Sequence, residues 1–149
     1  MRTYIYVGAV VAALGVLYWA VLPTNPSGTE QQMAQAQSAA PQGAPIVEVV
    51  LPPELSSNAK LGKTIFKATC AACHGINAAG QEGVAPPLVH KIYEPSHHGD
   101  ESFWIATQRG VRAHHWRFGD MPRIEGLTRA DVMMVVAYIR ELQRENGIK

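Results

Sequence analysis

The five residues Cys70-Ala-Ala-Cys73-His74 constrain this chain more than any other feature. Two cysteines separated by two residues and followed at once by histidine have the spacing used for covalent haem attachment. The two thiols can add across the two vinyl groups of one haem, and the adjacent imidazole then lies beneath the iron as an axial ligand. Because these are the only two cysteines of the chain, the sequence predicts one covalent haem c.

Three other uses of the cysteine pair remain open on the motif alone. A thioredoxin-like redox dithiol would need an α/β pattern around it, and the sequence shows no strand–helix–strand alternation. A disulfide between Cys70 and Cys73 is compatible with an oxidising compartment. A structural zinc site needs four ligands, which later histidines can supply. These histidines are His90, His97, His98, His114 and His115.

Length and charge limit the class of protein. The 149 residues suit one small domain with an accessory segment. The formal net charge is +1, and no basic stripe is visible along the chain. Since nucleic-acid binding proteins carry a basic footprint, we expect no nucleic-acid partner.

Residues 4–22 form an apolar run of 19 residues without a charge. That length is enough for a helix to cross a hydrocarbon core of about 30 Å. Arg2 precedes the run, which predicts a cytoplasmic N-terminus. The alternative is a cleaved signal peptide, but its apolar core runs only about 7–15 residues. We therefore expect residues 1–22 to be an uncleaved single-pass anchor in a bacterial inner membrane, with the remainder in the periplasm.

Residues 23–53 have the composition of a linker. They are rich in Gln, Ala, Ser, Pro and Gly and contain no aromatic residue. Such a linker is either a passive spacer or a tether that raises the local concentration of the domain near membrane partners. An apolar patch at Ile46–Leu51 either lies along the folded domain or leads into it. The folded domain is expected at residues 54–149.

The first helix of this domain is expected to begin after an N-cap serine, Ser56 or Ser57, and to deliver Cys70 to the haem. Its glycine, Gly62, costs helix stability unless another part of the structure must approach closely there. Its predicted apolar stripe consists of Leu61, Ile65 and Ala68, with Phe66 beside it.

Two further helices complete an all-α prediction. One covers residues 100–108 and ends at Gly110. The last begins at Thr128, with Asp131 in the position of a capping-box acid. Its predicted buried face consists of Val132, Val135, Val136, Ile139 and Leu142. The long loops between the helices are compatible with a compact domain if a haem gives them an apolar surface to wrap.

In order and spacing, these features resemble a class I cytochrome c over about residues 55–146. The matching pieces are the Gly62/Phe66 helix, Cys70-x-x-Cys73-His74-Gly75, Pro86-Pro87-Leu88, the helix ending at Gly110, Gly119-Asp120-Met121-Pro122, and residues 136–142 of the last helix. The resemblance implies a cytochrome c fold of three to five helices around one covalent haem, preceded here by a transmembrane helix and a flexible linker. It also implies that Tyr138 packs over Gly62.

The same resemblance assigns the ligands. Cys70 and Cys73 form the thioethers, His74 is the proximal ligand, and the carbonyl of Pro86 accepts the other imidazole N–H. Met121, which stands 47 residues after His74, is the expected distal ligand. A neutral thioether at that position raises the reduction potential. The alternative is a loop methionine that fills a gap in packing.

His114 and His115 rival Met121 as the distal ligand. Ligation by His114 or His115 would give a His/His haem of lower potential. One of these residues, together with His97 or His98, is also a candidate copper site. Exposed loop positions and hydrogen bonds to a haem propionate are the remaining alternatives, and the sequence does not choose among them.

A haem closed by His74 and Met121 leaves no coordination site for a substrate, and no nucleophile–base pair stands out. We therefore expect an electron carrier and not an enzyme, exchanging one electron with protein partners on the periplasmic side. The partners would be an oxidase, a reductase or a dehydrogenase. The protein would act either as a tethered shuttle or as a cytochrome subunit of such a complex. One alternative keeps the fold but opens the distal site for ligand or peroxide chemistry. Another is a haem-free module that binds zinc or copper.

Overall fold

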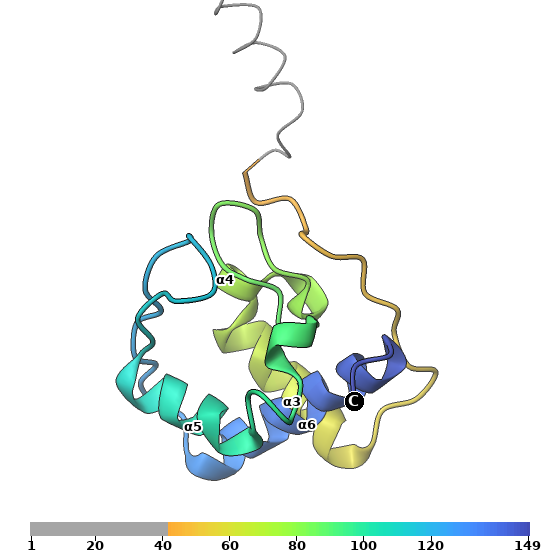
Figure 1. Cartoon of the computed structure of the whole chain (residues 1–149). Coiled ribbons are helices and arrows are strands. Elements are labelled where there is room, and N and C mark those ends of the chain that lie inside the picture. Colours follow the sequence, from red (N-terminus) through yellow and green to blue (C-terminus); the bar gives the residue numbers. More distant parts are fainter. Residues whose placement is uncertain (1–41) are drawn as a thin grey trace, which may run out of the picture. The chain divides into compact units, whose positions relative to one another are not determined.

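The computed structural model describes residues 42–149, so the predicted anchor at residues 1–22 and the linker as far as residue 41 lie outside the described residues. The helices are α3 (Ser57–Thr69), α4 (Ala71–His74), α5 (Asp100–Arg109) and α6 (Arg129–Glu145), with the short 3-10 helices η1 (Ile76–Ala78) and η2 (Lys91–Tyr93) (Figure 1). Extended pairing in the described range is limited to two isolated bridges, which agrees with the all-α prediction. Among the described helices, none has both the length and the apolar character needed to cross a bilayer.

The last residues of the predicted 23–53 linker lie along the domain, as the orange and yellow chain of Figure 1 shows. The amide of Gly43 donates to the carbonyl of Glu82 at 2.8 Å. Val50 pairs with the Asn146 side chain in both directions, at 2.9 Å through its N–H and 2.8 Å through its carbonyl. The apolar patch at residues 46–51 therefore lies along the folded domain, which is one of the two arrangements expected for it.

Side-chain caps begin both long helices, as the sequence predicts. The hydroxyl of Ser56 accepts a hydrogen bond from the amide of Ala59 at 3.3 Å. Thr128 Oγ1 accepts from the Asp131 amide at 3.2 Å, and the Asp131 carboxylate accepts from the Thr128 amide at 2.9 Å, which completes the capping box. The Thr128 hydroxyl, which donates to the Asp131 carboxylate at 2.6 Å, and then the Thr128 amide lower the pKa of this carboxyl. Each cap satisfies amides that have no partner inside the helix.

Helices α3 and α6 pack directly against each other through Gly62. A Cβ at this position would lie 1.8 Å from the carbonyl oxygen of Met134 and 2.9 Å from the amide nitrogen of Val135, so only glycine permits the approach. The ring of Tyr138 packs on Phe66 with centroids 5.8 Å apart. The atoms nearest to Gly62 belong to the α6 backbone, and the expected cover of this glycine by Tyr138 stays a prediction.

The buried face of α3 also differs from the predicted stripe. Ala59, Gly62 and Phe66 are buried, whereas Leu61 is 53% exposed. Ala68, also assigned to the stripe, is exposed. The buried residues are three and four positions apart and share one helical face. Small residues there allow α6 to approach, and this contact outweighs burial of the larger leucine.

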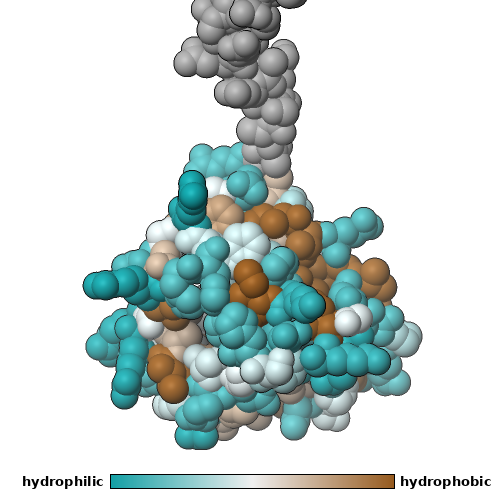
Figure 2. All heavy atoms as spheres, in the orientation of Figure 1, coloured by the Kyte–Doolittle hydropathy of each residue, from teal (hydrophilic) through white to brown (hydrophobic). Residues whose placement is uncertain are grey.

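The predicted face of α6 is confirmed, since each of its residues is at most 6% exposed. These residues are Val132, Val135, Val136, Ile139 and Leu142. Val135, Ile139 and Leu142 pack with Phe66, Ala78, Leu88 and Val89 in the core. On the face drawn in Figure 2, apolar residues also reach the surface between polar ones.

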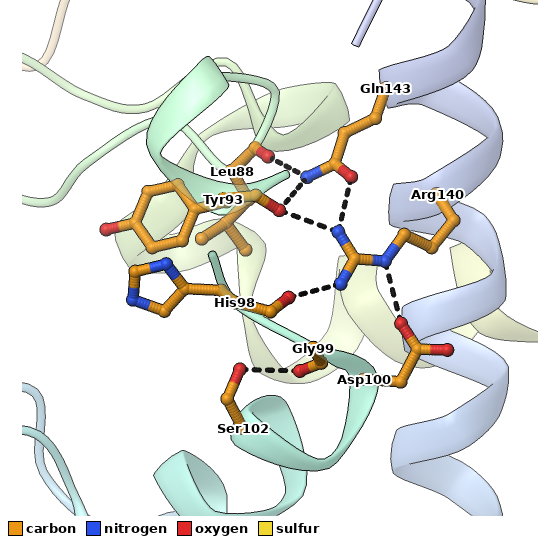
Figure 3. A network of polar contacts seen from close by, with 8 residues as sticks. All are labelled: Leu88, Tyr93, His98, Gly99, Asp100, Ser102, Arg140 and Gln143. Carbon is orange, nitrogen blue, oxygen red and sulfur yellow. Dashed lines mark hydrogen bonds and ion pairs between the residues drawn. The ribbon is translucent and has the colours of Figure 1, made fainter. Parts of the chain in front are cut away.

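Arg140, in contrast, is a buried cation in the C-terminal half of α6. Its guanidinium donates to the Asp100 carboxylate at 2.8 Å, and to the Tyr93 carbonyl and the Gln143 side-chain oxygen at 2.6 Å each (Figure 3). A fourth hydrogen bond goes to the carbonyl of His98. Because every partner is an acceptor, the burial of this charge is compensated.

Gln143 continues the same network. Its amide group donates to the carbonyls of Leu88 at 2.8 Å and Tyr93 at 3.0 Å (Figure 3). Arg140 also lies over the ring of Phe103, with the guanidinium carbon 5.1 Å from the ring centroid. Helix α6 thus fixes α5 and the irregular segment that precedes it through two polar side chains.

Candidate haem site

The motif residues lie on one helical turn that follows α3 directly. Cys70 caps the end of α3, and α4 covers Ala71–His74. The amides of Cys73 and His74 both donate to the carbonyl of Cys70, at 3.2 and 2.9 Å. Gly75 then ends the turn with φ +75°, a conformation that favours glycine. The backbone therefore fixes the three functional side chains relative to one another.

Both thiols of this turn are free, with Cys70 partly buried and Cys73 exposed. Burial raises the pKa of the Cys70 thiol, and the nearby Cys73 raises it further, while the hydroxyl of Thr69 at 3.3 Å lowers it in part. A redox-active C-x-x-C pair is characterised by a lowered thiol pKa. The environment of Cys70 therefore does not activate this thiol as a redox nucleophile.

His74 is buried, with 9% of its surface exposed. Its Nδ1 lies 2.9 Å from the carbonyl oxygen of Pro86. A carbonyl only accepts, so Nδ1 carries the proton and Nε2 keeps its lone pair. Burial lowers the pKa of the ring, against a smaller opposite effect of the Pro86 hydrogen bond, and the neutral form is favoured. This tautomer is the one that a metal-ligating histidine requires.

Gln81 supports the motif in a way that sequence reasoning missed. Its side-chain nitrogen lies 3.2, 2.8 and 3.1 Å from the carbonyl oxygens of Ala71, Ala72 and Cys73. The Ala71 carbonyl also accepts from the Gly75 amide at 3.0 Å, and the two N–H groups of the Gln81 amide are shared among the three carbonyls at this helix end. A bridge to Ala85 holds the Gln81 backbone in place. No local sequence pattern predicts such a contact, because it depends on the path of the loop that carries Gln81.

Met121 lies in another segment, the loop between α5 and α6. Its backbone pairs with Val111 in both directions at 2.9 Å, and its side chain is partly buried. Within this loop, the amide of Ala113 donates to the Asp120 carboxylate at 2.8 Å. Figure 1 shows the loop on the same side of the domain as α4. The role of Met121 as distal ligand stays a prediction.

One buried donor of this loop has no partner among residues 42–149, namely Nε1 of Trp116. The ring packs against Phe118 and His90, with centroids 5.7 and 5.2 Å away. Burial raises the pKa of the neighbouring Tyr93 hydroxyl. An unsatisfied buried N–H costs about 1–3 kcal/mol. The carboxylates of a bound haem are acceptors and fit this donor. The two thiols and the neutral imidazole of the motif also fit a haem.

Four histidines gather near the start of α5. The rings of His97, His98, His114 and His115 have centroid separations between 4.2 and 6.3 Å. Ligand atoms of His97, His98 and His115 all lie within 4.8 Å of one another. The sequence left the role of these residues open. Within the described domain they group with one another and not with the cysteines, which disfavours a mixed cysteine–histidine zinc site.

Comparison with known proteins completes this description. The cytochrome c family matches residues 59–143, which is more than half of the chain. The cbb3-type cytochrome c oxidase subunit FixP of Azorhizobium caulinodans is 29% identical over 124 residues, which cover 75% of this chain and 39% of that subunit. The chain thus spans about two-fifths of the length of this relative. It belongs to the cytochrome c family and carries a covalent haem c, for which Cys70, Cys73 and His74 provide the attachment motif.

Proposed function

We propose that this protein is a one-electron carrier whose haem is closed on both sides by its own side chains. The observation that carries this proposal is the buried imidazole of His74, whose Nδ1 is held by Pro86 at 2.9 Å so that Nε2 is free to ligate. When bound, haem c supplies reversible one-electron Fe(III)/Fe(II) chemistry. The work of this chain is to hold it, to set its potential and to present it to partners.

Each site residue has one role in this account. Cys70 and Cys73 hold the group covalently, and His74 ligates through Nε2. The carbonyl of Pro86 orients the imidazole and increases its basicity by accepting the Nδ1 proton in a hydrogen bond. Met121 supplies a thioether from the loop after α5, which excludes other ligands and favours the reduced state.

The setting of this carrier is inferred from the N-terminal sequence and from the oxidase subunit to which the chain is similar. The uncharged run at residues 4–22 acts as a single-pass anchor, and Arg2 keeps the N-terminus in the cytoplasm. The haem domain then works in the periplasm of a bacterium, as a cytochrome subunit or a tethered shuttle of a respiratory chain. Its partners are an oxidase, a reductase or a dehydrogenase, met through a small and weak interface.

One observation favours a second candidate function, in which the distal side opens for ligand or peroxide chemistry. The loop that carries Met121 is mostly exposed between residues 112 and 120, and it is closed by the reciprocal backbone pair with Val111 and by the hydrogen bond from the Ala113 amide to Asp120. A ligand on such a loop can be displaced at lower cost than one on a helix. The two candidate functions therefore differ in whether Met121 stays bound.

The substitution Met121→Ala tests the proposed ligation. We expect it to abolish the far-red methionine–iron charge-transfer band of the oxidised protein and to lower the midpoint potential. The matched control is Met133→Ala, a partly buried methionine on α6, which should leave both properties unchanged. Persistence of the band in Met121→Ala would show that another residue is the ligand.

A further inference from the structure

We propose that His97, His98 and His115 form a binding site for a divalent transition-metal ion, separate from the haem motif. One ligand atom from each ring lies within 4.8 Å of the other two. Imidazole nitrogens about 2.1 Å from a tetrahedral ion lie about 3.4 Å apart. Closing the three rings around an ion therefore requires side-chain shifts on the order of 1 Å, and two of the rings, His97 and His115, are exposed and free to make them.

Two of the three ligands lie on a well-fixed backbone. The amides of His97 and His98 both donate to the carbonyl of Glu94, at 3.0 and 2.8 Å. The carbonyl of His98 accepts from the buried guanidinium of Arg140 (Figure 3). This turn is thus attached to the core of the domain. Only His115 comes from the more exposed loop that follows α5.

The protonation of the His98 ring also suits a ligand. Its Nδ1 lies 2.6 Å from the carbonyl oxygen of Ile92, which only accepts, so Nδ1 holds the proton and Nε2 keeps its lone pair. Metal-ligating histidines commonly donate their other ring N–H to a backbone carbonyl in this way. The ring nitrogens of His97 and His115 make no hydrogen bond within residues 42–149 and therefore have no competing partner there.

The donor set indicates which ions would bind. Three neutral imidazoles suit Zn²⁺, Cu²⁺ and Ni²⁺, and they leave a further position for water. Nothing in this set resembles the oxygen-rich sites of Mg²⁺ or Ca²⁺. Because His115 lies in the loop that ends at Met121, a bound ion would also tie that loop to the turn before α5.

His114 provides a matched control beside the proposed site. Its ring lies 4.2 Å from that of His115, yet its ligand atoms fall outside the group of three. Its Nδ1 contacts the carbonyl oxygen of Arg112 at 2.8 Å, as that of His98 contacts Ile92, so the position of its ligand atoms and not its tautomer separates it from the site. Replacement of either histidine removes one exposed imidazole from the same loop, so the two variants differ mainly in whether a proposed ligand is lost.

The test is a calorimetric titration of the full haem-containing chain with Zn²⁺ and, separately, with Cu²⁺. We expect one ion per chain, with Cu²⁺ bound more tightly than Zn²⁺. The variants His115→Asn and His98→Asn should each weaken binding at least about tenfold, since loss of a mere outer-shell partner already costs about 10–100-fold. His114→Asn should stay close to the wild type.

The proposal is overturned if His115→Asn binds Zn²⁺ as tightly as the wild type, or no more weakly than His114→Asn. Thermal unfolding and the visible haem spectrum of each variant show whether its fold is intact. If His98→Asn perturbs the turn, His97→Asn replaces it as the test, because His97 is exposed and its substitution also removes one proposed ligand. Equal binding by all variants would show that the ion binds elsewhere.

Discussion

His74 and Met121, the two predicted iron ligands, lie in segments with very different support. His74 follows α3 on a turn whose backbone, ring and terminal carbonyls all have partners, from the Cys70 carbonyl to Pro86 and Gln81. Met121 lies at the end of a loop that the reciprocal backbone pair with Val111 and one side-chain hydrogen bond close. The comparison teaches that the attachment side is held redundantly, while the opposite side depends on a few contacts.

The redundancy on the His74 side has a structural origin. The turn continues α3, and α3 is fixed by its close packing on α6 at Gly62. Loops with few buried contacts open at lower free energy than a packed helix pair. We therefore expect ligand exchange, where it occurs, on the Met121 side. The following predictions test each side of this contrast.

The largest effect is expected for Gly62→Ala, on the well-supported side. A Cβ there would lie 1.8 Å from the Met134 carbonyl oxygen. Both atoms are bonded directly to helix backbones, which cannot yield locally. The loss of unfolding free energy should be about 3 kcal/mol or more, at the upper end of overpacking effects. Chemical denaturation measures it. The control Gly126→Ala, with φ +82° and no atom within 4 Å, should cost only about 1–2 kcal/mol.

A smaller effect is expected for Arg140→Met, which removes the buried link between α6 and α5. The Arg140 side chain is 8% exposed, and its loss leaves the acceptors on His98 and Gln143 unpaired, at a cost of about 2–3 kcal/mol. Arg129→Met is the matched control, since Arg129 also pairs with an α5 acid, Glu101 at 2.6 Å, but is 62% exposed. Its cost should be below about 1 kcal/mol. Equal unfolding midpoints for the two variants would contradict the role of the network.

The smallest effect on stability is expected on the loop side, for Gly110→Ala. This glycine has φ +72°, and a Cβ would lie 2.5 Å from the carbonyl oxygen of Met121. With ψ 179° this is a conformation that only glycine adopts readily, so we expect a loss of about 1–3 kcal/mol, together with a weaker far-red band because Met121 is displaced. Gly119→Ala carries similar backbone strain, with φ +94° and no atom within 4 Å, and should keep the band. Identical bands in both variants would show that the Val111 pairing does not position Met121.

The sequence predicted well the features that depend on neighbouring residues. The attachment motif, the capping box at Thr128 and Asp131, and the apolar face of α6 follow from spacing along one segment. It failed where the outcome depends on contacts between distant segments. Arg140 and Gln143 are buried because carbonyls from positions 42 to 55 residues away accept their hydrogen bonds. The face of α3 was misassigned because hydrophobic periodicity does not reveal a close approach through small residues.

The central claim is that the described fold presents a haem closed on both sides. Exposure of the reduced full chain to carbon monoxide at neutral pH tests it most directly, because this ligand binds only where the iron has an open or readily vacated position. Our account predicts that the visible spectrum of the wild type stays unchanged, while Met121→Ala shows the shift of a bound adduct. Rapid adduct formation by the wild type would contradict the account and favour ligand chemistry at an open distal side.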